Sequence, residues 1–124
     1  MIDFNNGAYL KLKKVAGDSV EKEVAPLFVN GEAIIGAYKS IRDFVVFTNK
    51  RIIAVNVQGL TGKKKDFSTL PYSKIQAFSI ETAGVLDLDS ELELYFSGLG
   101  KVRFEFTGAS DITTIGRIIG EMIL

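Results

Sequence analysis

The sequence predicts a mainly β fold, a seven-stranded antiparallel barrel or sheet pair with a C-terminal α-helix and an N-terminal helical segment. Alternation of apolar residues with charged or amphipathic ones over 91–97 and 102–107 indicates strands with one buried and one wet face. Turns rich in glycine and asparagine separate the strand-like runs between residues 32 and 107. An apolar stripe at helical spacing follows the last run, so we expect one helix to cap the sheet.

Residues 1–17 are treated as an N-terminal extension, and residues 18–124 as the folded domain with its N-terminal helix. A short helix from about Gly7 and a frayed segment are both compatible with the extension. Asp18 can cap the next helix, with Glu21 three residues later. The apolar residues of this helix share one face: Val20, Val24 and Leu27. Pro26 distorts or ends the helix, because its ring nitrogen cannot donate to the preceding turn.

Five strands are expected before the last hairpin, over residues 32–40, 43–48, 51–58, 66–70 and 75–82. Asn49 marks the tight turn between the second and third of these strands, because asparagine tolerates left-handed backbone conformations. The stretch 32–38 carries little charge and lacks proline, so it is the poorest-protected candidate for a sheet edge. We expect the N-terminal helix to cover that edge, within one subunit or across a subunit boundary.

The last hairpin has a well-determined register, because a slip by one residue would pair leucine with glutamate. Glu93 and Arg103 should lie opposite or diagonal on its wet face. The predicted barrel core includes apolar residues from four strands: Phe47, Ile53, Val55, Leu92, Leu94, Phe96, Phe104 and Phe106.

The final helix should span about 110–123, with Ser110 or Asp111 as its cap. The four-residue spacing of Gly116 and Gly120 indicates close approach of the helix backbone to the sheet rather than a membrane dimerisation motif.

Composition excludes several classes of function. The chain has 15 basic and 15 acidic residues, whereas a dedicated nucleic-acid binder is usually clearly basic, so we expect no nucleic-acid partner. It has no cysteine and no histidine, which removes disulfides, thiolate metal sites and the commonest general base. We therefore expect no metal, no cofactor and no catalytic residue. No signal peptide pattern and no apolar run of about 20 residues is present, so a cytoplasmic location is expected.

Five basic residues are candidates for contact with an anion or a partner: Lys39, Arg42, Lys63, Lys64 and Lys65. The lysine run at 63–65 could meet phosphate, an acidic lipid surface or an acidic protein. It could equally be a solvated loop, since lipid-binding clusters usually contain about 4–8 basic residues. Lys50 and Arg51 are interpreted as turn and strand-start charges rather than as anion ligands.

Several motifs resemble those of the bacterial pleckstrin-homology-like (PH-like) family. They are Phe47–Arg51, Gly59–Lys64, Leu70–Tyr72, Glu81–Gly84 and Asp87–Leu92. The resemblance runs from about residue 18 to the C-terminus. It implies a seven-stranded PH barrel with a C-terminal helix, and ring-shaped homo-oligomers, pentamers in the first instance. Lipid-binding PH domains carry several basic residues around the loop between their first two strands, whereas this chain offers only Lys39 and Arg42 there, beside Asp43.

Two functions are therefore considered. The first is a non-enzymatic PH-like domain that forms a homo-oligomer and presents a surface to an unknown protein partner. The second is an anionic-lipid or anion-binding module that uses Lys63–Lys65 together with Lys39 and Arg42, which would associate with membranes.

Overall fold

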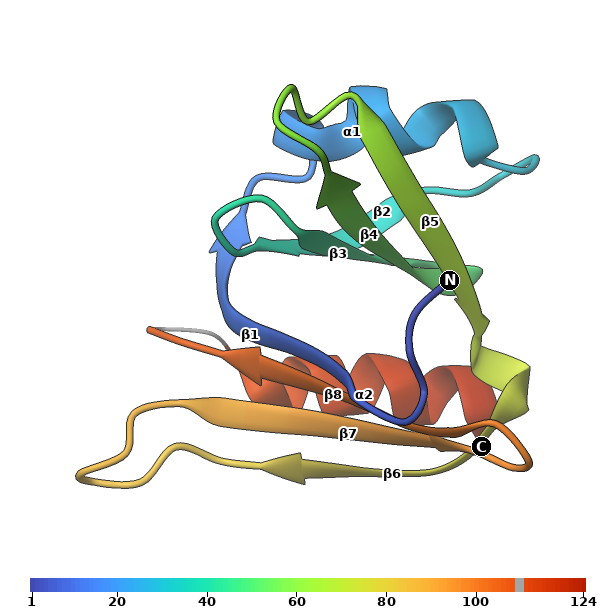
Figure 1. The fold of residues 1–124 in the computed structure, drawn as a ribbon. Helices are drawn as coiled ribbons and strands as arrows, with labels where there is room; N and C mark the ends of the chain where they lie inside the picture. The colour runs from blue at the N-terminus through green and yellow to red at the C-terminus, as the bar shows by residue number, and fades with distance from the viewer. Residues whose placement is uncertain (109–110) are drawn as a thin grey trace.

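The computed structural model describes residues 1–108 and 111–124. In these residues, eight strands form one curled half-barrel in the order β5-β4-β3-β2-β1-β8-β7-β6 (Figure 1). The strands are β1 (Gly7–Val15), β2 (Ile34–Lys39), β3 (Phe44–Thr48), β4 (Arg51–Gln58), β5 (Lys64–Pro71), β6 (Ile75–Glu81), β7 (Ser90–Phe96) and β8 (Gly100–Phe106). The helices are α1 (Asp18–Val24) and α2 (Ile112–Ile123), with short 3-10 turns η1 (Ala25–Leu27) and η2 (Tyr72–Lys74).

The predicted fold class is confirmed, and each of the seven expected strands is present. The structure adds an eighth strand, β1, inside the expected N-terminal extension, so neither of the two alternatives for this segment, a short helix from Gly7 or a frayed end, is found. The first part of β1 pairs parallel with β8, and its last part, from Lys13 to Val15, pairs antiparallel with β2. The sheet is therefore mixed, and β1 joins its two halves.

A bulge explains why β1 is hard to recognise in the sequence. The register shifts between Tyr9 and Leu12, and Lys11 between them has a left-handed φ of 55°. The extra residue places the buried side chains Tyr9 and Leu12 three positions apart, which is a helical rather than a strand spacing. The chain bends at this point, which lets one strand serve both halves of the sheet.

Two cores lie on opposite faces of the sheet. The main core fills the half-barrel, and a second core lies between the outer face of the sheet and α1. Both faces of β3 and β4 are buried, which accounts for their continuous apolar runs. All the predicted core residues are buried. However, Ile53 and Val55 belong to the core under α1, with Val20 and Val24 of that helix, and not to the barrel interior.

The helix α1 begins at Asp18, as predicted, but Asp18 does not cap it. Gly17 occupies the capping position, and no side chain makes a capping hydrogen bond there. Pro26 lies in η1, where the α-helix has already ended, as expected for proline.

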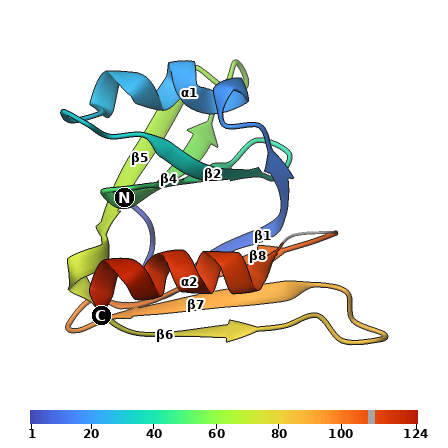
Figure 2. The same ribbon diagram turned by 180° about the vertical axis from the view of Figure 1, so that it is seen from behind.

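The helix α2 packs along the β6–β7 half of the sheet and against η2 (Figure 2). Asp111 caps it by accepting a hydrogen bond from the Thr114 amide at 3.3 Å, whereas the alternative cap at position 110 lies outside the described residues. A Cβ atom at Gly116 would lie 3.2 Å from Ile80 Cδ1, so this glycine does allow close packing. Gly120 does not allow closer packing, because a Cβ atom there would meet only Leu124 Cδ1, at an ordinary contact distance of 3.9 Å. No helix among the described residues has the length and apolarity to span a bilayer.

The hairpin of β7 and β8 has the predicted register, with Glu93 directly opposite Arg103. The ion pairs run along the diagonals instead. Arg103 Nη1 lies 2.9 Å from Glu91 Oε1, and Lys101 Nζ lies 3.2 Å from Glu93 Oε2.

The sheet edges are not where the sequence pattern placed them. β2, in the expected edge stretch 32–38, pairs with β3 along its length and with β1 at its C-terminal end. The strands at the ends of the sheet order are β5 and β6. β1, hidden in the extension, occupies the side of β2 that was expected to be open.

Candidate functional site

The predicted basic residues are only partly brought together. Arg42 lies in the β2–β3 turn, and its guanidinium donates a hydrogen bond to the Gly59 carbonyl in the β4–β5 loop, next to Lys63 and Lys64. In the described part of the chain, Lys63 and Lys64 are exposed and form no ion pair. Lys65 Nζ lies 3.9 Å from Glu23 Oε1 of α1, so a carboxylate partly neutralises it.

Lys39 stands apart from this loop. It is exposed at the end of β2 and pairs in register with Lys13 of β1. The five candidates therefore do not converge on one anion. Two of them, Arg42 and Lys65, already contact other groups of the protein.

Arg51 does bind an anion, but one that belongs to the chain itself. Its Nε and Nη2 atoms donate to the two carboxylate oxygens of Glu32 at 2.9 and 3.0 Å. Arg51 also donates to Thr69 Oγ1 at 3.0 Å and to the Leu27 carbonyl at 2.6 Å. The bidentate geometry makes this a strong, charge-assisted contact that ties η1 to β4 and β5. The motif 47–51 is thus structural, in agreement with its interpretation as turn and strand-start charges.

The carboxylate of Glu32 is fully buried. Burial alone would raise its pKa, but hydrogen bonds from Arg51, from Thr48 Oγ1 at 2.7 Å and from the Val29 amide at 3.0 Å lower the pKa to about 2. The hydroxyl of Tyr72 donates to the Thr48 carbonyl at 2.7 Å, which extends the network into the main core. Glu32 is therefore charged whenever the fold is intact near neutral pH.

The strongest candidate for a contact surface is the tip of the β6–β7 hairpin. Its apolar side chains Val85, Leu86 and Leu88 are 94 %, 98 % and 65 % exposed. We call these three residues the hairpin tip. Figure 1 shows the loop between β6 and β7 extending well beyond the rest of the sheet. Three neighbouring apolar side chains in water have an unfavourable hydration that a partner surface would relieve.

A shallow groove of about 210 Å³ lies on the same hairpin, away from its tip. Phe78, Leu94 and Tyr95 supply its apolar wall. Tyr95 is 47 % exposed, and Lys101 stands at the rim. The tip and the groove are therefore two separate patches on the β6–β7 hairpin, the tip in the loop and the groove along the strands.

Sequence reasoning did not single out the hairpin tip. The signal was present as a run of apolar residues, Gly84-Val85-Leu86, between two strands, where solvated turns normally carry polar residues. The acidic residues Asp87 and Asp89 follow this run, so the segment as a whole has the composition of a solvated turn.

The chain matches the model of the family described as Bacterial PH domain over residues 3–123. Two relatives come from Bacillus subtilis strain 168. The uncharacterized protein YjqA is 42 % identical over 108 residues, which cover 86 % of each chain. The uncharacterized protein YozO is 35 % identical over 98 residues, which cover 79 % of this chain and 84 % of the relative.

Solved structures agree with this match. A DUF1696 family protein with a pleckstrin-homology domain from Shewanella loihica is 37 % identical, with a TM-score of 0.80 over 93 % of this chain and 99 % of the other. A pleckstrin homology domain from Shewanella amazonensis is also 37 % identical, with a TM-score of 0.67 over 89 % of this chain and 90 % of the other. The family match includes β1, the strand that the sequence pattern did not reveal.

Proposed function

The chain belongs to the bacterial PH domain family, and from that premise we propose that it is a non-enzymatic PH-like domain that forms a ring-shaped homo-oligomer. The ring, with five subunits in the first instance, would present a composite surface to a protein partner. The observation that carries the proposal is the exposed hairpin tip, which has no covering element within the described part of the chain.

The partner of the hairpin tip in this proposal is a second copy of the chain. The groove beside Tyr95 is apolar and lies on a different part of the same hairpin, so a tip-to-groove contact is head-to-tail. Head-to-tail contacts generate a closed ring when the rotation permits. The charges do not oppose the contact, because Lys101 and Glu93 at the rim of the groove pair with each other, and Asp87 is the acidic residue beside the tip.

Sedimentation velocity on two matched variants tests this assignment. Leu86→Asp places a charge in the proposed contact and should shift the oligomer to smaller species. Leu60→Asp is the control, because Leu60 is also a fully exposed leucine in a loop, but at the β4–β5 turn. An unchanged oligomer in Leu86→Asp would exclude the hairpin tip as the contact between copies.

The alternative function is an anion- or lipid-binding module that uses the Lys63–Lys65 loop. The observation in its favour is the exposure of Lys63 and Lys64 without ion pairs in the described chain. Against it, Arg42 and Lys65 are engaged elsewhere, and so few free cations attract an anionic surface weakly.

Co-sedimentation with anionic liposomes at low and moderate salt separates the two functions. The triple variant Lys63→Ala, Lys64→Ala, Lys65→Ala should behave like the wild type if the homo-oligomer is the functional form. Binding by the wild type that the triple variant loses would favour the alternative.

A further inference from the structure

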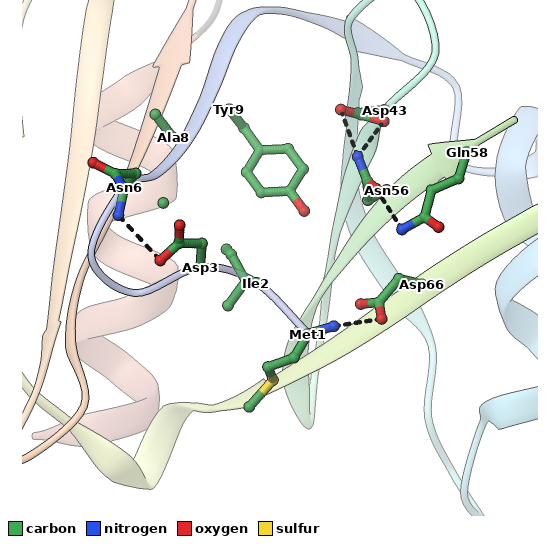
Figure 3. A pocket seen from close by; sticks show the side chains of 11 residues that line it. Met1, Ile2, Asp3, Asn6, Ala8, Tyr9, Asp43, Asn56, Gln58 and Asp66 are labelled. Atoms are coloured by element: carbon green, nitrogen blue, oxygen red, sulfur yellow. Dashed lines mark hydrogen bonds and ion pairs between the residues drawn. The ribbon is translucent and has the colours of Figure 1, made fainter.

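A polar cleft of about 250 Å³ opens between the N-terminal segment and the strands β1, β4 and β5 (Figure 3). The segment 1–6 crosses from β1 to β5, where the Ile2 amide donates to Ser68 Oγ at 2.8 Å. Behind it, the ring of Phe4 packs on Phe96 at 5.7 Å between centroids. The cleft is therefore a hollow between two anchored walls, and it lies apart from the hairpin tip.

The wall of the cleft is acidic. Three carboxylates line it, those of Asp3, Asp43 and Asp66, and no lysine or arginine is among its described lining residues. The α-ammonium group of Met1 forms an ion pair with Asp66 at this wall, so the carboxylates still outnumber the cation. A cleft with excess carboxylates and few charges to balance them attracts cations.

Asp43 and Asp66 are held in place by the fold. Asp43 Oδ1 accepts hydrogen bonds from the Val57 amide at 2.9 Å and from Asn56 Nδ2 at 3.2 Å. The hydrogen bond from the terminal ammonium lowers the pKa of Asp66, and Ser68 Oγ donates to its other oxygen at 3.3 Å. Both carboxylates remain able to accept further hydrogen bonds, because each ionised carboxylate offers about four lone-pair sites.

Tyr9 supplies an independent indication of a ligand. The residue is only 9 % exposed, and its hydroxyl has no hydrogen-bond partner among the described residues. Figure 3 shows the ring in the middle of the cleft, with the hydroxyl directed toward the side that Asn56 and Asp66 form. Burial and the nearby charges of Asp43 and Asp66 raise the pKa of Tyr9 to about 12, so the hydroxyl keeps its proton at neutral pH. No fully buried side-chain oxygen of the described residues lacks a partner, so the Tyr9 hydroxyl is accessible from the cleft and available to a ligand there.

We propose that this cleft binds a small organic cation through its primary ammonium or guanidinium group. Asp43 and Asp66 would accept its N–H donors and balance its charge, while the Tyr9 oxygen would accept another. Asn56 and Gln58 would contribute amide oxygens at the wall. The volume suits a ligand smaller than typical drug-sized molecules.

The chemistry of the wall argues for this class of ligand over two others. Anions would meet carboxylates without a compensating cation. For a metal ion, the described residues contain no group of three or more acidic, histidine or cysteine side chains close enough to hold it.

Titration of the purified chain with agmatine, which carries both an ammonium and a guanidinium group, tests the proposal. Calorimetry and the ring resonances of selectively labelled tyrosine should report saturable binding, with the Tyr9 signals moving first. Tyr9→Phe keeps the ring, including its packing on Phe104 at 5.5 Å, and should weaken binding several-fold. Asp43→Asn and Asp66→Asn should each weaken it about tenfold or more, as expected for a lost charge-assisted hydrogen bond.

Glu21→Gln is the matched control, because it removes one exposed carboxylate on α1 far from the cleft and should leave affinity unchanged. A blocked lysine derivative, which represents a peptide side chain, and putrescine, which represents a free amine, are titrated in parallel. The probe with the higher affinity identifies the kind of ligand. The proposal is overturned if no saturable binding occurs, or if tetramethylammonium, which has no N–H donor, binds as tightly as agmatine. Equal affinity in the wild type, Tyr9→Phe and Asp43→Asn, with folding verified by circular dichroism, would overturn it as well.

Discussion

The buried ion pair between Glu32 and Arg51 makes a quantitative prediction about acid stability. Glu32→Gln keeps the size of the side chain but removes its charge. The substitution leaves the guanidinium of Arg51, only 16 % exposed, without a counter-ion. It also weakens the hydrogen bond from Thr48 and replaces an acceptor of the Val29 amide. Removing one partner of a buried pair is costly because the other charge remains desolvated.

The magnitude follows from the pKa. The difference between the ordinary pKa of 4.5 and about 2 in the folded protein corresponds to roughly 3 kcal/mol of unfolding free energy at neutral pH. Because water still reaches part of the Arg51 side chain, we expect a loss of about 2–3 kcal/mol for Glu32→Gln. Because folding lowers this pKa, the contribution is complete above pH 4.5 and disappears as the pH falls from 4.5 toward about 2.

Urea denaturation followed by far-ultraviolet circular dichroism provides the assay, at fixed protein concentration because assembly also affects stability. At about pH 7 the variant should be less stable than the wild type, and at about pH 2.5 the difference in stability should be much smaller. Glu21→Gln, at an exposed position of α1, should match the wild type throughout. The reasoning would be refuted if Glu32→Gln and the wild type were equally stable at neutral pH. It would also be refuted if the difference in stability were the same in acid as at neutral pH.

Four further substitutions test the packing. Phe104→Ala should lower the free energy of unfolding by about 3–5 kcal/mol, because it leaves a cavity at a fully buried position in the main core. An unchanged urea midpoint would mean that the other face of β8 is the buried one. Gly116→Leu should destabilise the fold by about 1–3 kcal/mol, because a side chain there would push into Ile80. Gly120→Ala should stabilise it by up to about 1 kcal/mol, because alanine favours the helix and meets open space. Melting temperatures that move the other way would show that Gly120, and not Gly116, contacts the sheet. Lys11→Gly should stabilise the fold by up to about 1 kcal/mol, because glycine adopts the left-handed backbone at this position without strain. A loss of stability in chemical denaturation would mean that the contacts of the lysine side chain outweigh that strain.

Alternation made the C-terminal half of the sheet predictable. Leu92, Leu94 and Phe104 face inward while the intervening charged residues face water, so period and register could both be inferred. β3 and β4 were found as strands, but their two buried faces left no alternation from which to separate the barrel interior from the core under α1. For this reason Ile53 and Val55 were assigned to the wrong one of two cores.

β1 was missed because a bulge changes the spacing of its buried side chains. Tyr9 and Leu12 have the separation of one helical turn, which is why a short helix was compatible with this segment. The error propagated to the sheet edges, because β1 occupies the side of β2 that appeared open.

The acidic cleft could not be predicted from any local motif. Its charged residues Asp3, Asp43 and Asp66 lie far apart in the sequence. The pairing of β3, β4 and β5 brings Asp43 and Asp66 together on either side of Asn56, and the segment before β1 adds Asp3. The basic run at 63–65, by contrast, was conspicuous in the sequence, yet the fold partly neutralises it through Glu23. Proximity in the chain was therefore a poor guide to where side chains converge.

The homo-oligomer is the central claim about function, and the mass of the wild-type protein in solution tests it most directly. Size-exclusion chromatography coupled to light scattering should give one species of about five chain masses that persists on dilution. The mass of a single chain across a wide concentration range would contradict both the ring and the composite protein-binding surface proposed to depend on it.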